Sequence, residues 1–214
     1  MKKVFIFALG LLIAGEANAQ NSTSKSTGGP QFGLKAGGNY SNIIKTGDRD
    51  FKTEFKPGFN AGLFLEIPIV SNLSFAPELM YSQKGYKRTG TSFLFGEPTE
   101  YSVTTNFIEV PVLAKIKASN NFSIVVGPQV SFLSSTTEKF TTGSSQSQRT
   151  VKEENDNLKK SLFGGVVGLG IDLTPKVSLN GRYALDFQKN NENGSSESPQ
   201  YKNQVIQASL GFKF

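Results

Sequence analysis

Eight segments of the chain alternate apolar and polar side chains with a period of two. This is the period of a β-strand that has one face in an apolar environment and the other in a polar one. The predicted strands are residues 31–43, 58–67, 73–87, 101–117, 122–135, 161–173, 177–188 and 201–214. Each is near or above the roughly 9 to 11 residues with which a tilted strand crosses a bilayer.

The connectors between these strands alternate between short and long. The short ones are rich in Pro, Asn and Ser, which is typical of tight turns, and are residues 68–72, 118–121 and 174–176. The long ones are polar and are residues 44–57, 88–100, 136–160 and 189–200. Every second connection of a membrane barrel lies on the same side of the membrane. The sequence therefore predicts an all-β fold, an eight-stranded antiparallel up-and-down transmembrane β-barrel, with both termini on the periplasmic, short-turn side.

The N-terminal segment predicts export. Lys2 and Lys3 precede an apolar run of residues 4–14, and a small-x-small motif ends at Ala19. This arrangement is typical of a secretory signal peptide, and the apolar run is too short for a spanning helix. We expect a signal peptide, a flexible Ser/Thr/Gly-rich tail and an outer-membrane β-barrel domain at residues 1–19, 20–30 and 31–214. The chain has no cysteine, so it has no disulfide framework.

The more apolar alternate residues of each strand are expected to face lipid. They include Phe59, Ala61, Leu63, Leu65, Ile67, Phe75, Pro77, Leu79, Tyr81, Ile108, Val110, Val112, Ala114, Ile124, Val126, Val130, Phe132, Val177, Leu179, Tyr183, Leu185 and Phe187. Aromatic residues at the two ends of these stripes predict two interfacial girdles. One girdle holds Phe122, Phe212 and Phe214 near the short turns, and the other holds Tyr40, Tyr81 and Phe187 towards the loops.

The opposite faces of the strands carry charges of both signs. These inward residues are Lys35, Glu66, Glu78, Lys84, Glu109, Arg182, Asp186 and Lys213. The interior of an eight-stranded barrel is only just wide enough for side chains to fill. Buried charges must be paired or hydrogen-bonded, and Asn39, Gln129, Ser178 and Asn180 are expected to help. The sequence predicts a closed polar and charged lumen with a structural role.

Two of these carboxylates also admit a functional interpretation. Glu78 and Glu109 could form a gate or a ligand clamp with Lys84, Lys115 or Arg182, whereas an ion-pair lattice that fills the barrel explains them without a ligand. The glycine-rich run of residues 164–170 contains a Gly-x-Gly pair, but no helix follows it, so it is no dinucleotide fingerprint. We expect these glycines to permit strand coiling and close approach of large neighbours.

The last strand is expected to close the barrel. Its apolar stripe of Ile206, Ala208, Leu210, Phe212 and Phe214 completes the lipid-facing wall and lies against the first strand. The terminal aromatic pattern resembles the signal by which outer-membrane assembly machinery recognises its clients. Leu210, Phe212 and Phe214 are the residues that would carry that signal.

Four segments resemble the PorT-like outer-membrane β-barrel family. They are GLKAGGNYS at residues 33–41, PELMYSQKG at 77–85, FIEVPVLAK at 107–115 and VGPQV at 126–130. The resemblance implies a small signal-bearing barrel in the outer membrane. The member that gives the family its name is tied to protein secretion across that membrane, so the resemblance also implies a secretion role as an alternative.

The composition excludes most catalytic barrels. The chain has no histidine, so it holds no Ser-His-Asp triad, no Cys-His pair and no ordinary zinc site. Its net charge of +6 is spread through loops of mixed sign, which does not favour nucleic acid as a partner. Calcium binding by Glu153, Glu154, Asp156 and Asn157 has no EF-hand spacing to support it. Carboxylate chemistry or a lysine base is what remains for catalysis, and we expect no enzyme activity, no cofactor and no bound metal.

Three functional hypotheses follow. The first is a non-enzymatic integral outer-membrane protein with a closed lumen, which is structural or interacts through its long external loops. The alternative is a transport or protein-secretion accessory component, and a third reading is a soluble secreted barrel of lipocalin type. The expected partners are outer-membrane lipid, the outer-membrane assembly machinery and an unidentified surface or secretion partner.

Overall fold

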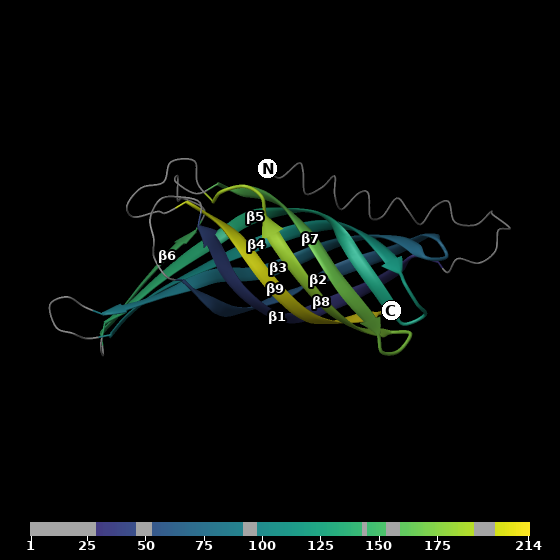
Figure 1. Ribbon diagram of the computed structural model, residues 1–214, viewed down its shortest axis with the longest axis horizontal. Helices are drawn as coiled ribbons and strands as arrows, with labels where there is room; N and C mark the ends of the chain where they lie inside the picture. The colour runs from purple at the N-terminus through teal and green to yellow at the C-terminus, as the bar shows by residue number, and fades with distance from the viewer. Residues whose placement is uncertain (1–28, 46–52, 92–97, 143–144, 153–158, 191–199) are drawn as a thin grey trace.

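A computed structural model describes residues 29–45, 53–91, 98–142, 145–152, 159–190 and 200–214, and these residues form one curved antiparallel sheet (Figure 1). Its strands are β1 (Gln31–Lys45), β2 (Glu54–Val70), β3 (Leu73–Thr91), β4 (Pro98–Lys117), β5 (Phe122–Thr142), β6 (Ser145–Lys152), β7 (Ser161–Asp172), β8 (Val177–Asp186) and β9 (Tyr201–Lys213). No helix in the described residues is long and apolar enough to cross a membrane. The predicted signal peptide lies outside the described residues, as does nearly all of the predicted tail.

Eight of these strands close into an up-and-down barrel. The hydrogen-bonded order is β4-β3-β2-β1-β9-β8-β7-β5, and β4 also pairs with β5. The seam between β1 and β9 runs from Gly33 opposite Lys213 to Lys45 opposite Tyr201. The predicted eight-stranded antiparallel barrel is confirmed, and its last strand closes against its first.

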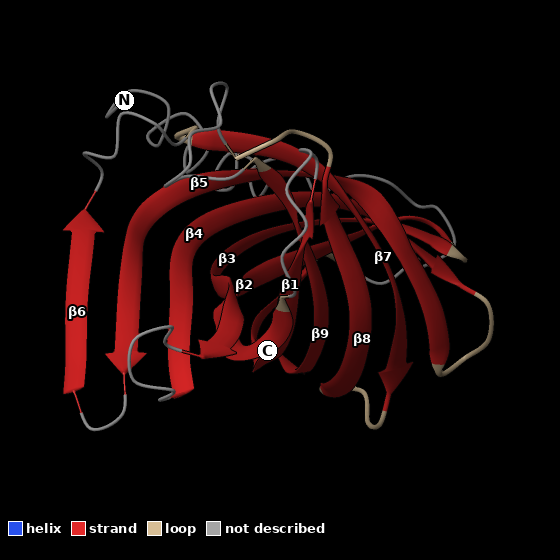
Figure 2. Ribbon diagram, turned by 60° about the vertical axis from the view of Figure 1, so that its left-hand side comes forward, coloured by secondary structure: helices blue, strands red, loops and turns tan. Residues whose placement is uncertain are grey.

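The predicted loop of residues 136–160 is wrong in part. β5 continues to Thr142, and β6 turns back to pair with it from Thr142 opposite Ser145 to Ser135 opposite Lys152. β3 and β4 also run several residues beyond their predicted loop-side ends. Threonine and other β-branched residues favour an extended backbone even where no face is apolar. We call residues 86–91, 98–105 and 135–142 together with β6 the extension, and Figure 2 shows β6 at its edge, apart from the barrel.

The exterior of the barrel is apolar, as the alternation predicts. Leu63, Val112 and Leu210 are exposed on its surface, which is the arrangement expected for side chains that contact lipid. β7 adds a stripe that the prediction did not include, consisting of Phe163, Val167, Leu169 and Ile171. Aromatic pairs lie towards both ends of the wall: Phe32 with Phe214 and Phe212 with Phe214 by the short turns, and Tyr40 with Phe55, Phe59 with Tyr81 and Phe163 with Phe187 towards the loops.

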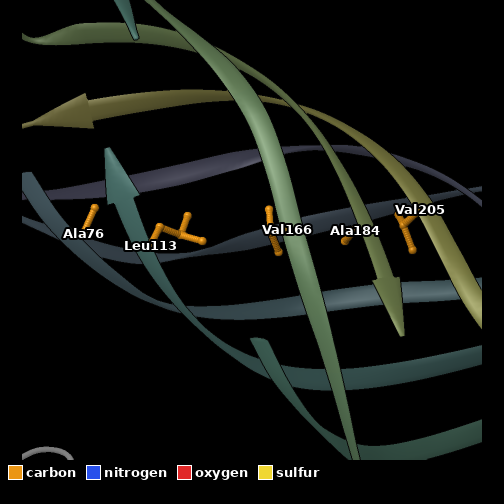
Figure 3. Packing of buried hydrophobic residues seen from close by; sticks show 5 residues of the cluster. All are labelled: Ala76, Leu113, Val166, Ala184 and Val205. Atoms are coloured by element: carbon orange, nitrogen blue, oxygen red, sulfur yellow. The ribbon is translucent and has the colours of Figure 1, made fainter. Parts of the chain in front are cut away.

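Two apolar clusters lie inside the barrel. The first consists of small and medium side chains from five strands, Ala76, Leu113, Val166, Ala184 and Val205 (Figure 3). The second lies at the loop end and consists of Ile43, Tyr86, Val103 and Tyr201, with Tyr101 packed against it. The charged side chains of the lumen are distributed around these two clusters.

Candidate functional site

All eight charged residues predicted to face inward are buried in the lumen. They join into three groups along the barrel axis, at the short-turn end, in the middle and towards the loop end. Two further residues, Lys115 and Asp172, complete the set. The ten side chains carry five positive and five negative charges, so the lumen is electrically balanced.

The group at the short-turn end joins four strands. The Glu66 carboxylate of β2 lies 2.9 Å from Lys115 Nζ of β4 and 3.3 Å from Lys213 Nζ of β9. Asp172 of β7 lies 3.4 Å from Lys213 and 3.9 Å from Lys115. Ser74 donates to Glu66 at 3.4 Å. Each carboxylate is shared by both lysines, which fixes this end of the lumen across its width.

The middle group centres on Glu78. Lys35 Nζ of β1 approaches one carboxylate oxygen at 2.5 Å, and Arg182 Nη1 of β8 approaches the other at 2.6 Å. Arg182 Nε also donates to Gln207 Oε1 at 2.6 Å. The Lys35 ammonium lies 5.2 Å from the centroid of the Phe64 ring, within range of a cation–π contact. Glu78 and Arg182 thus link two strands on different sides of the barrel.

The upper group centres on Lys84, which is 1% exposed. Its ammonium lies 2.7 Å from Glu109 and 3.4 Å from Asp186. Asn203 donates to Asp186 at 2.7 Å, and Ser131 donates to Glu109 at 3.4 Å. Lys84 is therefore the cation shared by two buried carboxylates, and neither of them reaches solvent.

An aromatic layer lies above the upper group. The rings of Tyr86 and Tyr201 meet edge to face with centroids 5.4 Å apart, and both side chains are buried. Ile43 and Val103 are also buried in this layer. Such a layer keeps water from the charged groups beneath it and so strengthens their attraction.

A glycine makes room for the arginine. Gly168 of β7 pairs in register with Arg182 of β8, and a Cβ at this glycine would lie 2.5 Å from Arg182 Cβ. The neighbouring Gly181 faces outward, and a Cβ there would meet nothing within 4 Å. The inward glycine thus lets a large side chain pass close to the sheet.

The predicted polar helpers bind uncharged neighbours instead. Asn39 donates to Ser82 at 3.1 Å and accepts from Asn60 at 2.6 Å. Gln129 donates to Ser131, and Asn180 donates to Ser178, each at 3.1 Å. The charged residues bind one another and other polar side chains, among them Gln207 and Asn203, so these amides fill gaps in the wall. Asp172 was not among the predicted inward residues, because no inward face was predicted for its strand.

The acidic side chains of the lumen are held by cations. Glu78 binds two cations, and Lys84 lies between Glu109 and Asp186. Among the described residues no group of three or more His, Cys, Asp or Glu side chains could hold a metal ion. The acidic residues 153–157 that were considered for calcium lie outside the described residues.

The residues of the predicted assembly signal lie on the outer surface at the short-turn end. Leu210, Phe212 and Phe214 are exposed, and the Phe214 ring contacts Phe32 and Phe212. Their exposure leaves them accessible before lipid covers them. Their role in assembly stays a prediction.

The fold and the apolar exterior define the class of protein as an outer-membrane β-barrel. The chain belongs to the family of the outer membrane protein β-barrel domain, whose model matches residues 18–192. That match ends before β9, which closes the barrel at the seam described above. Membership sets aside the soluble, lipocalin-type reading. No curated protein sequence matches the chain.

One solved structure supports the same architecture, and two others have a weaker likeness to the chain. Neisserial surface protein A is 16% identical with a TM-score of 0.50, over 87% of this chain and 100% of that chain. Ail of Yersinia pestis is 13% identical with a TM-score of 0.45, over the same shares, and the outer membrane protease OmpT of Escherichia coli is 10% identical with a TM-score of 0.42, over 91% of this chain and 99% of that chain. Similarity at this level extends to the fold alone.

Proposed function

We propose that this protein is a non-enzymatic outer-membrane barrel with a closed lumen, which acts through the extension as an interaction surface outside the cell. The observation that carries the proposal is the interlocked lumen. Ten charged side chains form ion pairs across it at three levels, and an aromatic layer covers them at the loop end. A barrel filled in this way interacts with other molecules at its ends rather than through its centre.

The extension has two features suited to a partner. On its inner face Tyr101 lies opposite Phe140, whose side chain is 49% exposed although it faces no lipid. Within the described residues β6 pairs with β5 alone, so its other edge presents backbone donors and acceptors. An exposed sheet edge can accept an added strand, and exposed aromatic side chains anchor many interfaces.

The proposed orientation follows the rule for outer-membrane barrels, in which short turns are periplasmic and long loops external. Both termini then lie on the periplasmic side. The exposed aromatic residues at the end of β9 lie where assembly machinery in the periplasm would meet them. The extension is then outside the cell.

Surface labelling tests this orientation. The chain has no cysteine, so a single introduced cysteine is the sole target. We expect Ser147→Cys in β6 to react with a membrane-impermeant maleimide on intact cells. Asn120→Cys, in the short turn after β4, is the matched control and should react only after the outer membrane is permeabilised. The reverse pattern would overturn the orientation.

The alternative is a transport or protein-secretion accessory component. The four segments that resemble the PorT-like family support it, because the name-giving member is tied to secretion. A transport role needs a path for solute through the lumen, whereas an accessory role at the external face does not. Conductance of the purified protein separates the transport version from the closed barrel.

A further inference from the structure

Three lysines gather at the outer face of the extension, two on its own strands and a third that reaches it from β2. Lys87 of β3, Ser102 of β4 and Lys139 of β5 form one row across adjacent strands. Their neighbours Tyr86 and Val103 are buried inside the barrel, so by strand alternation this row faces outward. Ser102 lies between the two lysines in this row and is only 7% exposed.

The third lysine reaches the same place from β2. The register of β2 against β3 shifts between Phe55 and Asn60, and Lys56 lies in that irregular stretch. Its ammonium donates to Thr104 Oγ1 of β4 at 2.7 Å. The residue of β3 opposite Thr104 is Gly85, and its missing side chain lets the lysine cross over the strand.

The cluster has an excess of positive charge. Lys87 pairs with Glu100 at 3.1 Å, and both side chains are partly exposed. Within the described part of the chain, no carboxylate forms an ion pair with Lys56 or Lys139. The nearby Glu54 accepts a hydrogen bond from Thr89. The Lys56 ammonium is therefore bound by a threonine hydroxyl of β4, the strand that pairs with the strand of Lys139.

The cluster lies just beyond the apolar wall. Tyr81, whose ring is tilted against that of Phe59, marks the loop end of that wall on β3. The next outward row is a ladder in which Gln83 donates to Asn106 at 3.2 Å and Asn106 donates to Ser135 at 2.8 Å. The Thr104 row follows, roughly 10 Å beyond Tyr81 along the membrane normal for a tilted strand. This is the depth of lipid headgroups and their first sugars.

We propose that Lys56, Lys87 and Lys139, with the Thr104 hydroxyl, bind a phosphate group on a lipid headgroup of the leaflet at the loop end. Phosphate attracts clustered ammonium groups, and lipid diffuses along the barrel wall directly to this position. With the orientation proposed above, the lipid is the phosphorylated glycolipid of the outer leaflet. The identity of the leaflet rests on that proposed orientation, and the binding chemistry does not.

Native mass spectrometry of the refolded full-length barrel in detergent tests the proposal, with bisphosphorylated lipid A and dephosphorylated lipid A as probes. We expect the wild type to prefer the phosphorylated lipid by about tenfold or more. The triple variant Lys56→Gln/Lys87→Gln/Lys139→Gln should lose that preference, and Lys56→Gln alone should lose part of it. The control Lys117→Gln/Lys160→Gln/Lys176→Gln removes the same charge from exposed positions elsewhere and should keep the preference.

Three outcomes would overturn the proposal. Equal binding of the two lipids by the wild type would mean that these lysines form only a solvated surface. Loss of preference in the control triple variant would assign the effect to overall charge. Displacement of the lipid by inorganic phosphate at the same concentration would assign the site to free phosphate. A protein in a detergent micelle has no membrane orientation. The lipid preference measured there is therefore independent of the surface-labelling result that tests the orientation.

Discussion

Replacing Lys84 by methionine is expected to destabilise the barrel by about 3 to 5 kcal/mol, the cost of breaking a buried ion pair. Lys84 is the cation between Glu109 and Asp186, at 2.7 and 3.4 Å. Methionine has a similar shape but no charge, so two buried carboxylates would be left without the cation that they share. Equilibrium unfolding of the refolded protein in urea measures the loss.

The matched control is Lys87→Met on the same strand. Lys87 pairs with Glu100 at 3.1 Å, but the side chains are 33% and 44% exposed. Exposed pairs contribute about 0 to 1 kcal/mol, so this change should have little effect. Adding Glu109→Gln to Lys84→Met should recover part of the loss, because one uncompensated charge is removed. Equal losses for Lys84→Met and Lys87→Met would contradict the account of the lumen.

Replacing Val112 by arginine is expected to cost about 2 to 4 kcal/mol, the penalty for arginine facing lipid near the bilayer midplane. Val112 is exposed in the middle of an outward stripe on β4 that runs from Ile108 to Ile116. The change leaves the lumen untouched, so a loss reports on the exterior alone. Folding efficiency into lipid vesicles and unfolding in guanidinium both measure it.

Asn106→Arg is the control for this second prediction. Asn106 faces outward on the same strand, but it belongs to the hydrogen-bonded ladder with Gln83 and Ser135 above the aromatic residues. Arginine near the membrane interface costs about 0 to 1 kcal/mol. A similar large penalty at both positions would mean that the lipid boundary lies higher on β4 than the structure indicates.

The period of two in the sequence was sufficient to predict the barrel and the facing of most of its strands, although no face was assigned to β7. A strand that contacts lipid on one side and a polar lumen on the other must alternate. On β2, Leu63 is exposed on the outer surface and Glu66 is buried in the lumen, as this rule requires. β6 escaped prediction because its segment, SQSQRTVK, has no alternation of apolar and polar residues. Its pairing with β5 is a tertiary contact, and no apolar stripe in its own sequence indicates it.

The pairing inside the lumen could not be predicted from the sequence. Alternation determines that Glu78 and Arg182 face inward, but the stagger of neighbouring strands determines which inward residues share a level. Glu78 meets Arg182 across 104 positions of the sequence. Lys115 and Asp172 join Glu66 and Lys213 for the same reason, because the register brings the ends of four strands together.

The conductance of the purified, refolded protein in a planar bilayer is the most direct test of the central claim, a lumen closed by its own side chains. The account predicts no discrete current steps for the wild type, because three levels of ion pairs and the Tyr86–Tyr201 layer occupy the path. Stable channels of uniform size would contradict the closed barrel and favour the transport alternative.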